Sequence, residues 1–139
     1  MFVDEVTRAL YVGENSDDPL WKETWMVVEE KRMEGVLVLS LRGRLDSNTS
    51  DEFERLLLGK VQEGENRFIL DFRDLDYISS AGLRVLLKAT KELKKTSGRM
   101  CLCCIRDYIQ EVLDLSGFSS FLPIRPDLNE SLKGFAGNP

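Results

Sequence analysis

The segment over residues 71–84 carries the side chains with the clearest potential for chemistry. An apolar run ends there at Asp71, an acidic stretch with Asp74 and Asp76 follows, and Ser80 stands where a helical pattern begins. The first N–H groups of a helix lack partners within the helix, so a serine at this place is ordinarily an N-cap. The same N–H groups, with the positive end of the helix dipole, also suit a phosphoserine. Residue type alone therefore leaves Ser80 two roles, a helix cap or a phosphorylation site.

Other catalytic and metal-binding chemistry has little support in the sequence. Histidine is absent, which excludes Ser-His-Asp and Cys-His catalysis and histidine-ligated metals. Cys101, Cys103 and Cys104 lie in one apolar run without a fourth cysteine, so we expect free core thiols in a reducing compartment. The sequence contains no GxxxxGK[ST] loop, and the aspartates are expected to be solvated turn residues instead of Mg²⁺ ligands. We therefore expect no enzymatic activity, no metal and no cofactor.

Length and charge limit the remaining classes of function. The 139 residues predict one domain, and the net charge of −5 gives no overall attraction to nucleic acid or to anionic membranes. No stretch approaches the ~20 apolar residues that span a bilayer. The first residues lack the basic and then apolar pattern of a signal peptide, since Asp4 and Glu5 come almost at once. We expect a cytoplasmic protein without direct nucleic-acid binding or membrane insertion.

Alternating hydrophobic patterns predict a single α/β domain over residues 23–139. Strands are expected over residues 25–30, 36–42, 67–71 and 100–105, with a short extended segment at 121–124. One helix is expected after Asn48 or Thr49, and further helices over residues 81–96, 106–115 and 126–135, with Val112 facing inward in the third. This alternation predicts a mostly parallel sheet of four to five strands covered by about four helices.

The first 22 residues differ from the rest of the chain. A turn-rich and acidic break covers residues 13–19, and the preceding segment from Val6 to Val12 fits either a short strand or a helical turn. We expect residues 1–22 to form an N-terminal extension that is partly disordered.

Three segments resemble the STAS domain found in bacterial anti-sigma factor antagonists. Residues 77–87 (YISSAGLRVLL) resemble its signature, and residues 42–46 (RGRLD), followed by Thr49, resemble its second landmark. Residues 99–102 (RMCL) and 112–118 (VLDLSGF) are similar to its C-terminal half. The resemblance covers roughly residues 24–137, and its specificity lies in the order and spacing of the three segments.

The resemblance implies a protein–protein switch. An unphosphorylated antagonist binds an anti-sigma factor that is also a serine kinase, so that the sigma factor is released. The kinase phosphorylates the antagonist with ATP and thereby ends binding, and a serine phosphatase resets the switch. The resemblance also implies the STAS fold and regulation of transcription that depends on the sigma factor.

The same resemblance assigns roles to individual residues. Ser80 aligns with the phosphoacceptor serine, and Asp46 matches a loop aspartate that lies near this serine and contacts the kinase. With Ser79, Gly82 and Leu83 they make up the expected partner-binding surface, in which Gly82 allows close approach to the backbone. Many antagonists carry aspartate where this chain has Ser79, so Ser79 is an alternative acceptor.

The sequence is also compatible with two other functions. A STAS module can instead be a soluble subunit of a lipid-transport ATPase or a scaffold in a stress-sensing complex. An enzyme that uses the acidic residues after Asp71 to hold Mg²⁺ is the second alternative, although the sequence supplies no acid/base pair for it.

Overall fold

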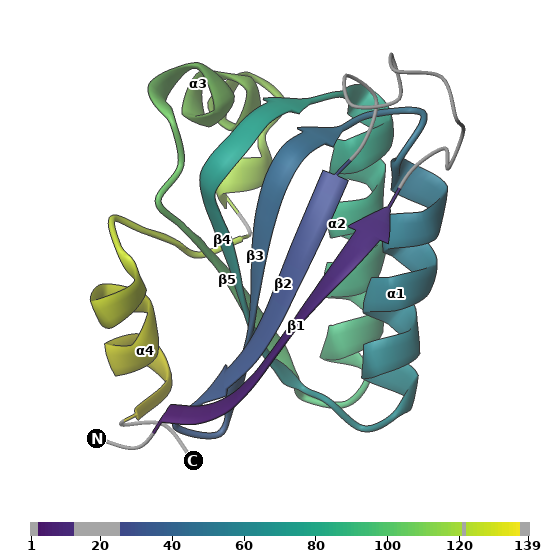
Figure 1. Ribbon diagram of the computed structural model, residues 1–139. Coiled ribbons are helices and arrows are strands. Elements are labelled where there is room, and N and C mark those ends of the chain that lie inside the picture. Colours follow the sequence, from purple (N-terminus) through teal and green to yellow (C-terminus); the bar gives the residue numbers. More distant parts are fainter. Residues whose placement is uncertain (1–2, 13–25, 121, 137–139) are drawn as a thin grey trace.

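The computed structural model describes residues 3–12, 26–120 and 122–136 and places six strands of these residues in one sheet, in chain order (Figure 1). The strands are β1 (Val3–Val12), β2 (Met26–Met33), β3 (Val36–Leu45), β4 (Arg67–Ile78), β5 (Arg99–Cys103) and β6 (Ile124–Arg125). The β1–β2 and β2–β3 pairs are antiparallel, and the pairs from β3 to β6 are parallel. The mostly parallel α/β fold predicted from the sequence is confirmed.

Four helices of the described residues cover this sheet: α1 (Ser50–Gln62), α2 (Ser80–Lys94), α3 (Asp107–Leu115) and α4 (Leu128–Ala136). Figure 1 shows α1 and α2 side by side on one face of the sheet and α4 on the other. Helix α3 lies at the end of the molecule where β3 and β4 finish. None of the described helices is both long and apolar enough to cross a membrane.

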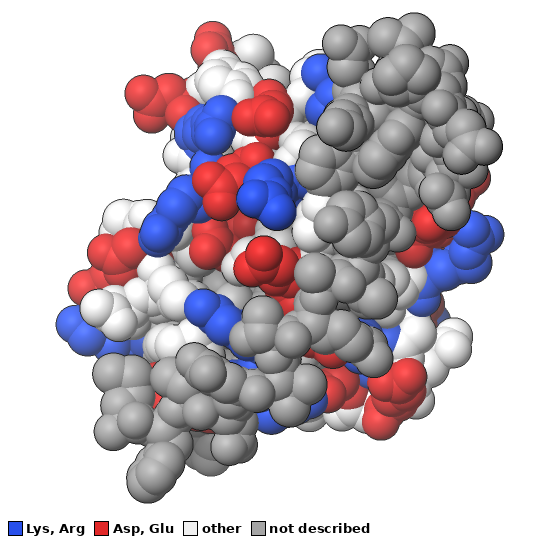
Figure 2. All heavy atoms as spheres, viewed as in Figure 1, with Lys and Arg blue, Asp and Glu red and all other residues white. Residues whose placement is uncertain are grey.

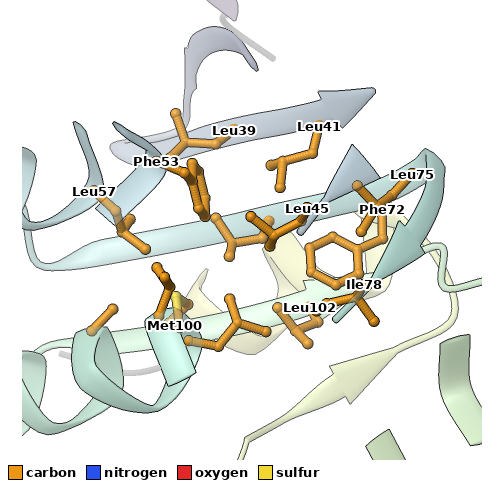
Figure 3. Packing of buried hydrophobic residues seen from close by; sticks show 14 of the residues in the cluster. Leu39, Leu41, Leu45, Phe53, Leu57, Phe72, Leu75, Ile78, Met100 and Leu102 are labelled. Atoms are coloured by element: carbon orange, nitrogen blue, oxygen red, sulfur yellow. The ribbon is translucent and has the colours of Figure 1, made fainter. Parts of the chain in front are cut away.

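Two hydrophobic clusters form the core, one on each face of the sheet. The larger contains residues of β2 to β5 with Phe53 and Leu57 of α1 and the inward faces of α2 and α3. Figure 3 shows how its members from β3, α1, β4 and β5 pack together. The smaller lies under α4, where Leu132 and Phe135 pack on β3, β4 and β5. Burial of the central strands on both faces explains their nearly continuous apolar sequences, which are typical of parallel sheets.

Strands β3 and β4 extend further than the sequence pattern predicts. We expected β4 to end at Asp71 and an acidic loop to follow, but β4 continues to Ile78 and β3 to Leu45. The pairing of the two strands shifts register twice, so β4 contains extra residues relative to β3. These bulges turn Phe72, Leu75 and Ile78 into the core at a spacing of three. The strict alternation of inward and outward side chains along β4 ends at the first bulge. The prediction of a loop after Asp71 was wrong because the strand continues beyond this bulge.

The N-terminal segment supplies the edge strand β1, which pairs antiparallel with β2. The sequence left the conformation of this segment open between a strand and a helical turn, and the structure shows a strand. The sheet has six strands instead of the expected four to five because β1 and the two-residue β6 both join it. The turn-rich break over residues 13–19 lies outside the described residues.

Charges on the face seen in Figure 2 are interleaved, with basic side chains lying next to acidic ones. Short-range pairs of this kind partly cancel the field of each charge in water. The chain as a whole nevertheless keeps its net charge of −5.

Candidate functional site

The site is built where β3 and β4 end side by side. Leu45 and Ile78 are register partners at the carboxyl ends of these parallel strands. The backbone N–H of Ser79 donates a hydrogen bond of 2.9 Å to the carbonyl of Leu45. Parallel pairing therefore brings the residue after each strand, Asp46 and Ser79, to the same edge of the sheet. Residues 42–46 and 77–87, the two motif segments, are separated in the chain by α1 and most of β4. They meet at this edge of the sheet.

Ser79 is the N-cap of α2, and Ser80 is not. The backbone of Ser79 is extended, and its side-chain oxygen accepts a hydrogen bond of 3.4 Å from the N–H of Gly82. Its carbonyl accepts the N–H of Leu83 at 3.0 Å, the first hydrogen bond of the helix. Together with the bond to Leu45, these contacts involve the N–H, the carbonyl and the hydroxyl of Ser79. Sequence reasoning placed the cap one residue too late.

Ser80 is the first residue of α2, and its side chain is exposed. Its hydroxyl makes no hydrogen bond to any residue in the described part of the chain. The first turn of α2 contains no acidic residue, so no carboxylate of that turn neutralises the positive end of the helix dipole. An exposed hydroxyl at this position is free to react, and an attached phosphate would meet a favourable electrostatic environment.

Gly82 and Leu83 lie beneath the surface. A Cβ atom on Gly82 would meet the carbonyl oxygen of Leu45 at 2.9 Å and the Cγ1 atom of Ile78 at 3.0 Å. Leu83 is 9% exposed and belongs to the larger core cluster. Glycine is therefore needed here for close packing of α2 on the end of β3. Both residues position the helix start instead of facing outward.

Asp46 organises the turn between β3 and α1. Its two carboxylate oxygens accept hydrogen bonds from the N–H of Asn48 at 2.9 Å and from Nε of Arg44 at 3.3 Å. Its backbone N–H donates to Oγ1 of Thr49, and that hydroxyl donates to the carbonyl of Arg44. Asp46 is only 8% exposed, so its main contacts are within the turn. Thr49 is the N-cap residue of α1, one of the two that the sequence offered.

Arg44 and Tyr77 belong to the site and were not predicted from the sequence. The guanidinium of Arg44 lies over the Tyr77 ring, 4.3 Å from its centroid, and the same side chain pairs with Asp46. Cation–π contacts at exposed sites contribute about 0.5–1 kcal/mol. The two residues are cross-strand partners on β3 and β4, so their contact depends on a register that bulges have shifted. The sequence signal was the YISS motif itself, whose first residue is Tyr77.

Exposed hydrophobic side chains gather on the outer side of α3. Tyr108, Val112 and Leu115 are 49%, 37% and 83% exposed, and with Tyr77 they are the large exposed hydrophobic residues of the described chain. Their spacing of four and then three residues places the α3 residues on one stripe of the helix. The prediction that Val112 faces inward was wrong, because Ile109 and Leu113 alone meet the core. We call Tyr108, Val112 and Leu115 the α3 stripe.

The α3 stripe is joined to the end of β4. The hydroxyl of Tyr108 donates to the carbonyl of Asp76 at 2.8 Å, and Nη1 of Arg106 pairs with the Asp76 carboxylate at 2.9 Å. Asp76 immediately precedes Tyr77 in the chain. The stripe and the Ser80 region therefore lie at the same end of the sheet.

The cysteines are free thiols, as the sequence predicts. Cys101 and Cys103 are buried, and burial raises the pKa of both thiols. Cys104 is half-buried and accepts a hydrogen bond of 3.4 Å from Nη2 of Arg73.

Comparison with known proteins decides the family. The family model of the STAS domain matches residues 28–131. This chain belongs to the STAS domain family.

Two relatives of this STAS protein carry a functional name. A protein of Bordetella bronchiseptica named as the anti-sigma factor antagonist BtrV is 40% identical over 93 residues, covering 67% of this chain and 80% of the relative. The anti-sigma F factor antagonist of Paenibacillus polymyxa is 30% identical over 98 residues, 70% of this chain and 84% of the relative.

Solved structures agree with the fold of this STAS protein. A Thermotoga maritima protein described as an anti-sigma factor antagonist aligns with a TM-score of 0.73 at 20% identity, over 76% of this chain and 91% of its own. Unphosphorylated SpoIIAA aligns with a TM-score of 0.65 at 18% identity, over 81% of this chain and 99% of its own. At this identity the two structures support the fold alone.

Proposed function

We propose that this STAS protein is an anti-sigma factor antagonist that binds an anti-sigma factor kinase and is released when Ser80 is phosphorylated. The observation that carries the proposal is the exposed hydroxyl of Ser80 at the first position of α2, which makes no hydrogen bond to the described residues and lies beside a serine that already caps the helix. The names of the two relatives supply the class of partner, an anti-sigma factor. In this role the protein is a cytoplasmic regulator and has no catalytic activity of its own.

Ser80 is the better acceptor of the two adjacent serines for a geometric reason. A kinase must place the attacking hydroxyl in line with the γ-phosphate of ATP, which requires an accessible side chain. Ser80 is exposed, whereas Ser79 is half-buried and its oxygen accepts the N–H of Gly82. Transfer to Ser79 would first break the cap of α2. The cap and the acceptor are therefore separate residues in this protein.

The surface around Ser80 divides into residues that touch the partner and residues that support them. Arg44, Tyr77 and Ser80 reach solvent and offer a cation, an aromatic ring and a hydroxyl. Gly82 and Leu83 set the position of the helix start from below. Asp46 holds Arg44 in place through its carboxylate and keeps a small exposed edge for the kinase.

Phosphorylation acts through local charge in this proposal. A phosphoserine adds about −1.5 to −2 charge units at pH 7. The carboxylates of Asp74 and Asp76 precede it on the same strand end, and Asp46 lies across the sheet edge. Asp46 and Asp76 are already paired with Arg44 and Arg106, so the phosphate adds net negative charge that a partner covering this surface must desolvate. The added repulsion and the lost contact together cost a few kcal/mol, which corresponds to roughly a hundredfold in affinity.

No large rearrangement of the fold is needed for such a switch. Both SpoIIAA forms, unphosphorylated and phosphorylated, are known structures, and this chain aligns with them at TM-scores of 0.65 and 0.62. We expect chemical-shift changes on phosphorylation to stay within the Ser80 region and its neighbours on β3 and β4. Large changes throughout the sheet would contradict a local mechanism.

The decisive experiment is phosphorylation by candidate kinases from the same genome. The protein and its Ser80→Ala and Ser79→Ala variants are incubated with each kinase and ATP, and the phosphorylated residue is mapped by mass spectrometry. We expect phosphate on Ser80, its loss in Ser80→Ala and its retention in Ser79→Ala, with removal by a serine phosphatase. Phosphate that persists in Ser80→Ala and vanishes in Ser79→Ala would overturn the assignment.

A pull-down separates this function from its main alternative. An antagonist should capture a kinase that binds ATP, and the phosphorylated protein should capture less of it. Capture of an ATP-binding-cassette protein without a kinase would instead favour the role of a transport ATPase subunit. Capture of other components of a stress-sensing complex without release on phosphorylation would favour a scaffold.

A further inference from the structure

Away from the Ser80 surface, three metal-ligating side chains converge on the sheet face opposite α1 and α2. The carboxylate of Asp71 and the sulfur atoms of Cys103 and Cys104 all lie within 4.8 Å of one another. Asp71 and Cys103 are register partners on the parallel strands β4 and β5. Cys104 follows β5 with a φ of 59°, in the left-handed region that side chains other than glycine adopt infrequently. We propose that Asp71, Cys103 and Cys104 form a binding site for a thiophilic divalent cation, namely Zn²⁺.

The donor set decides the kind of ion. Two thiolates and one carboxylate suit Zn²⁺, which is borderline soft and binds sulfur and oxygen ligands, and they suit Mg²⁺ and Ca²⁺ poorly. In tetrahedral coordination, with Zn–S near 2.3 Å, two sulfur ligands lie about 3.7 Å apart. The donors all lie within 4.8 Å of one another, so they need to approach by little more than about an ångström to reach this geometry. Three protein ligands leave one position of the tetrahedron for water or for a partner's side chain.

The three donors differ in their exposure to solvent. Cys103 is fully buried, so it anchors one side of the site, whereas Asp71 and Cys104 are half-buried. One carboxylate oxygen of Asp71 accepts the N–H of Arg73 at 2.9 Å, a contact that fixes the orientation of the carboxylate. An ion can enter from the side of Asp71 and Cys104 and complete its coordination at Cys103.

Arg73 is the competing cation at this site. Its Nη2 atom donates a hydrogen bond of 3.4 Å to Sγ of Cys104. Arg73 and a metal ion would therefore compete for the same sulfur atom. The side chain is exposed, so it can turn into solvent when an ion binds. Removal of this positive charge should leave metal binding unchanged or strengthen it.

The position of the site gives a bound ion a structural consequence. Arg106, at the start of α3, donates from Nε to the carbonyl of Arg73 at 3.1 Å. An ion held by Asp71, Cys103 and Cys104 would tie β4 to the connection between β5 and α3. It would thereby brace the segment that presents the α3 stripe, independently of whether Ser80 is phosphorylated.

Cobalt titration of the reduced, metal-free protein tests the site. Co²⁺ is a spectroscopic substitute for Zn²⁺, and its charge-transfer absorption in the near ultraviolet reports thiolate ligation directly. We expect one Co²⁺ per chain with this absorption and its displacement by Zn²⁺. Cys104→Ser and Asp71→Asn should each weaken binding by at least about tenfold. Arg73→Gln should bind at least as tightly as the unmodified protein.

Cys101→Ser is the matched control, because Cys101 is a thiol on the same strand that lies outside the donor set. It should bind Co²⁺ as the unmodified protein does. Thermal unfolding of each variant checks that the fold is intact, and Asp71→Asn keeps the test valid if Cys104→Ser does not fold. Absence of the charge-transfer absorption in the unmodified protein would overturn the proposal. So would unchanged binding by Cys104→Ser and Asp71→Asn, or an equal loss in Cys101→Ser.

Discussion

The two adjacent serines should separate cleanly when stability and phosphorylation are measured on the same variants. Ser79→Ala removes the side-chain cap of α2, which leaves the N–H of Gly82 without its partner. Loss of a serine N-cap costs about 1 kcal/mol. Ser80→Ala removes an exposed hydroxyl that makes no hydrogen bond to the described residues, and such surface changes stay within about 0.5 kcal/mol.

These energies translate into melting temperatures. Unfolding entropy near the midpoint is about 2.1 cal/mol/K per residue, which gives about 290 cal/mol/K for the 139 residues of this chain. A loss of about 1 kcal/mol therefore lowers the Tm by about 3 °C for Ser79→Ala, and a change within about 0.5 kcal/mol shifts it by less than about 2 °C for Ser80→Ala. Far-ultraviolet circular dichroism during a thermal scan is sufficient to resolve the two.

Ser79→Asp is the matched control, because aspartate caps a helix as well as serine does. It should restore the Tm while leaving Ser80 as the acceptor. The kinase assay should affect the other serine: phosphorylation is lost in Ser80→Ala and kept in both Ser79 variants. A Tm lowered by Ser80→Ala and unaffected by Ser79→Ala would refute the assignment of cap and acceptor.

Three further predictions concern the surroundings of the site. Gly82→Ala should lower the free energy of unfolding by about 1–3 kcal/mol in chemical denaturation, since its Cβ would meet the Leu45 carbonyl at 2.9 Å; an unchanged midpoint would contradict that packing. Leu115→Glu should leave stability unchanged at its 83% exposed position but weaken kinase binding in calorimetry, because we expect the α3 stripe to contact the partner; equal affinity would contradict this contact. Iodoacetamide should modify half-buried Cys104 in the native protein before buried Cys101, and peptide mapping that finds the reverse order would contradict their burial.

Local patterns in the sequence were sufficient for the family and most of the element order. The periodicity of helices and strands depends on neighbouring residues, so the alternation of strands and helices from β2 to α4 could be predicted without tertiary information. The motif from Tyr77 to Leu87 and its two companion segments identified a STAS domain, which the family match over residues 28–131 confirms. The sequence also located a helix start at the pair Ser79 and Ser80, because capping is a local interaction.

Contacts between distant segments were decided by the tertiary structure alone. The bulges of β4 extended the strand past Asp71, and only the resulting register put Tyr77 beside Arg44. The hydrogen bond from Ser79 to the carbonyl of Leu45 set where α2 begins, which made Ser79 the cap and left the hydroxyl of Ser80 exposed.

Tertiary packing likewise decided the outer face of α3 and the cluster of Asp71, Cys103 and Cys104. Periodicity on a short helix is compatible with more than one inward face, and packing against the core selected Ile109 and Leu113. Spacing along the chain showed two adjacent cysteines without further ligands, whereas pairing of β4 with β5 added a carboxylate from another strand. Sequence patterns determine which elements form, but strand register and packing determine which side chains meet.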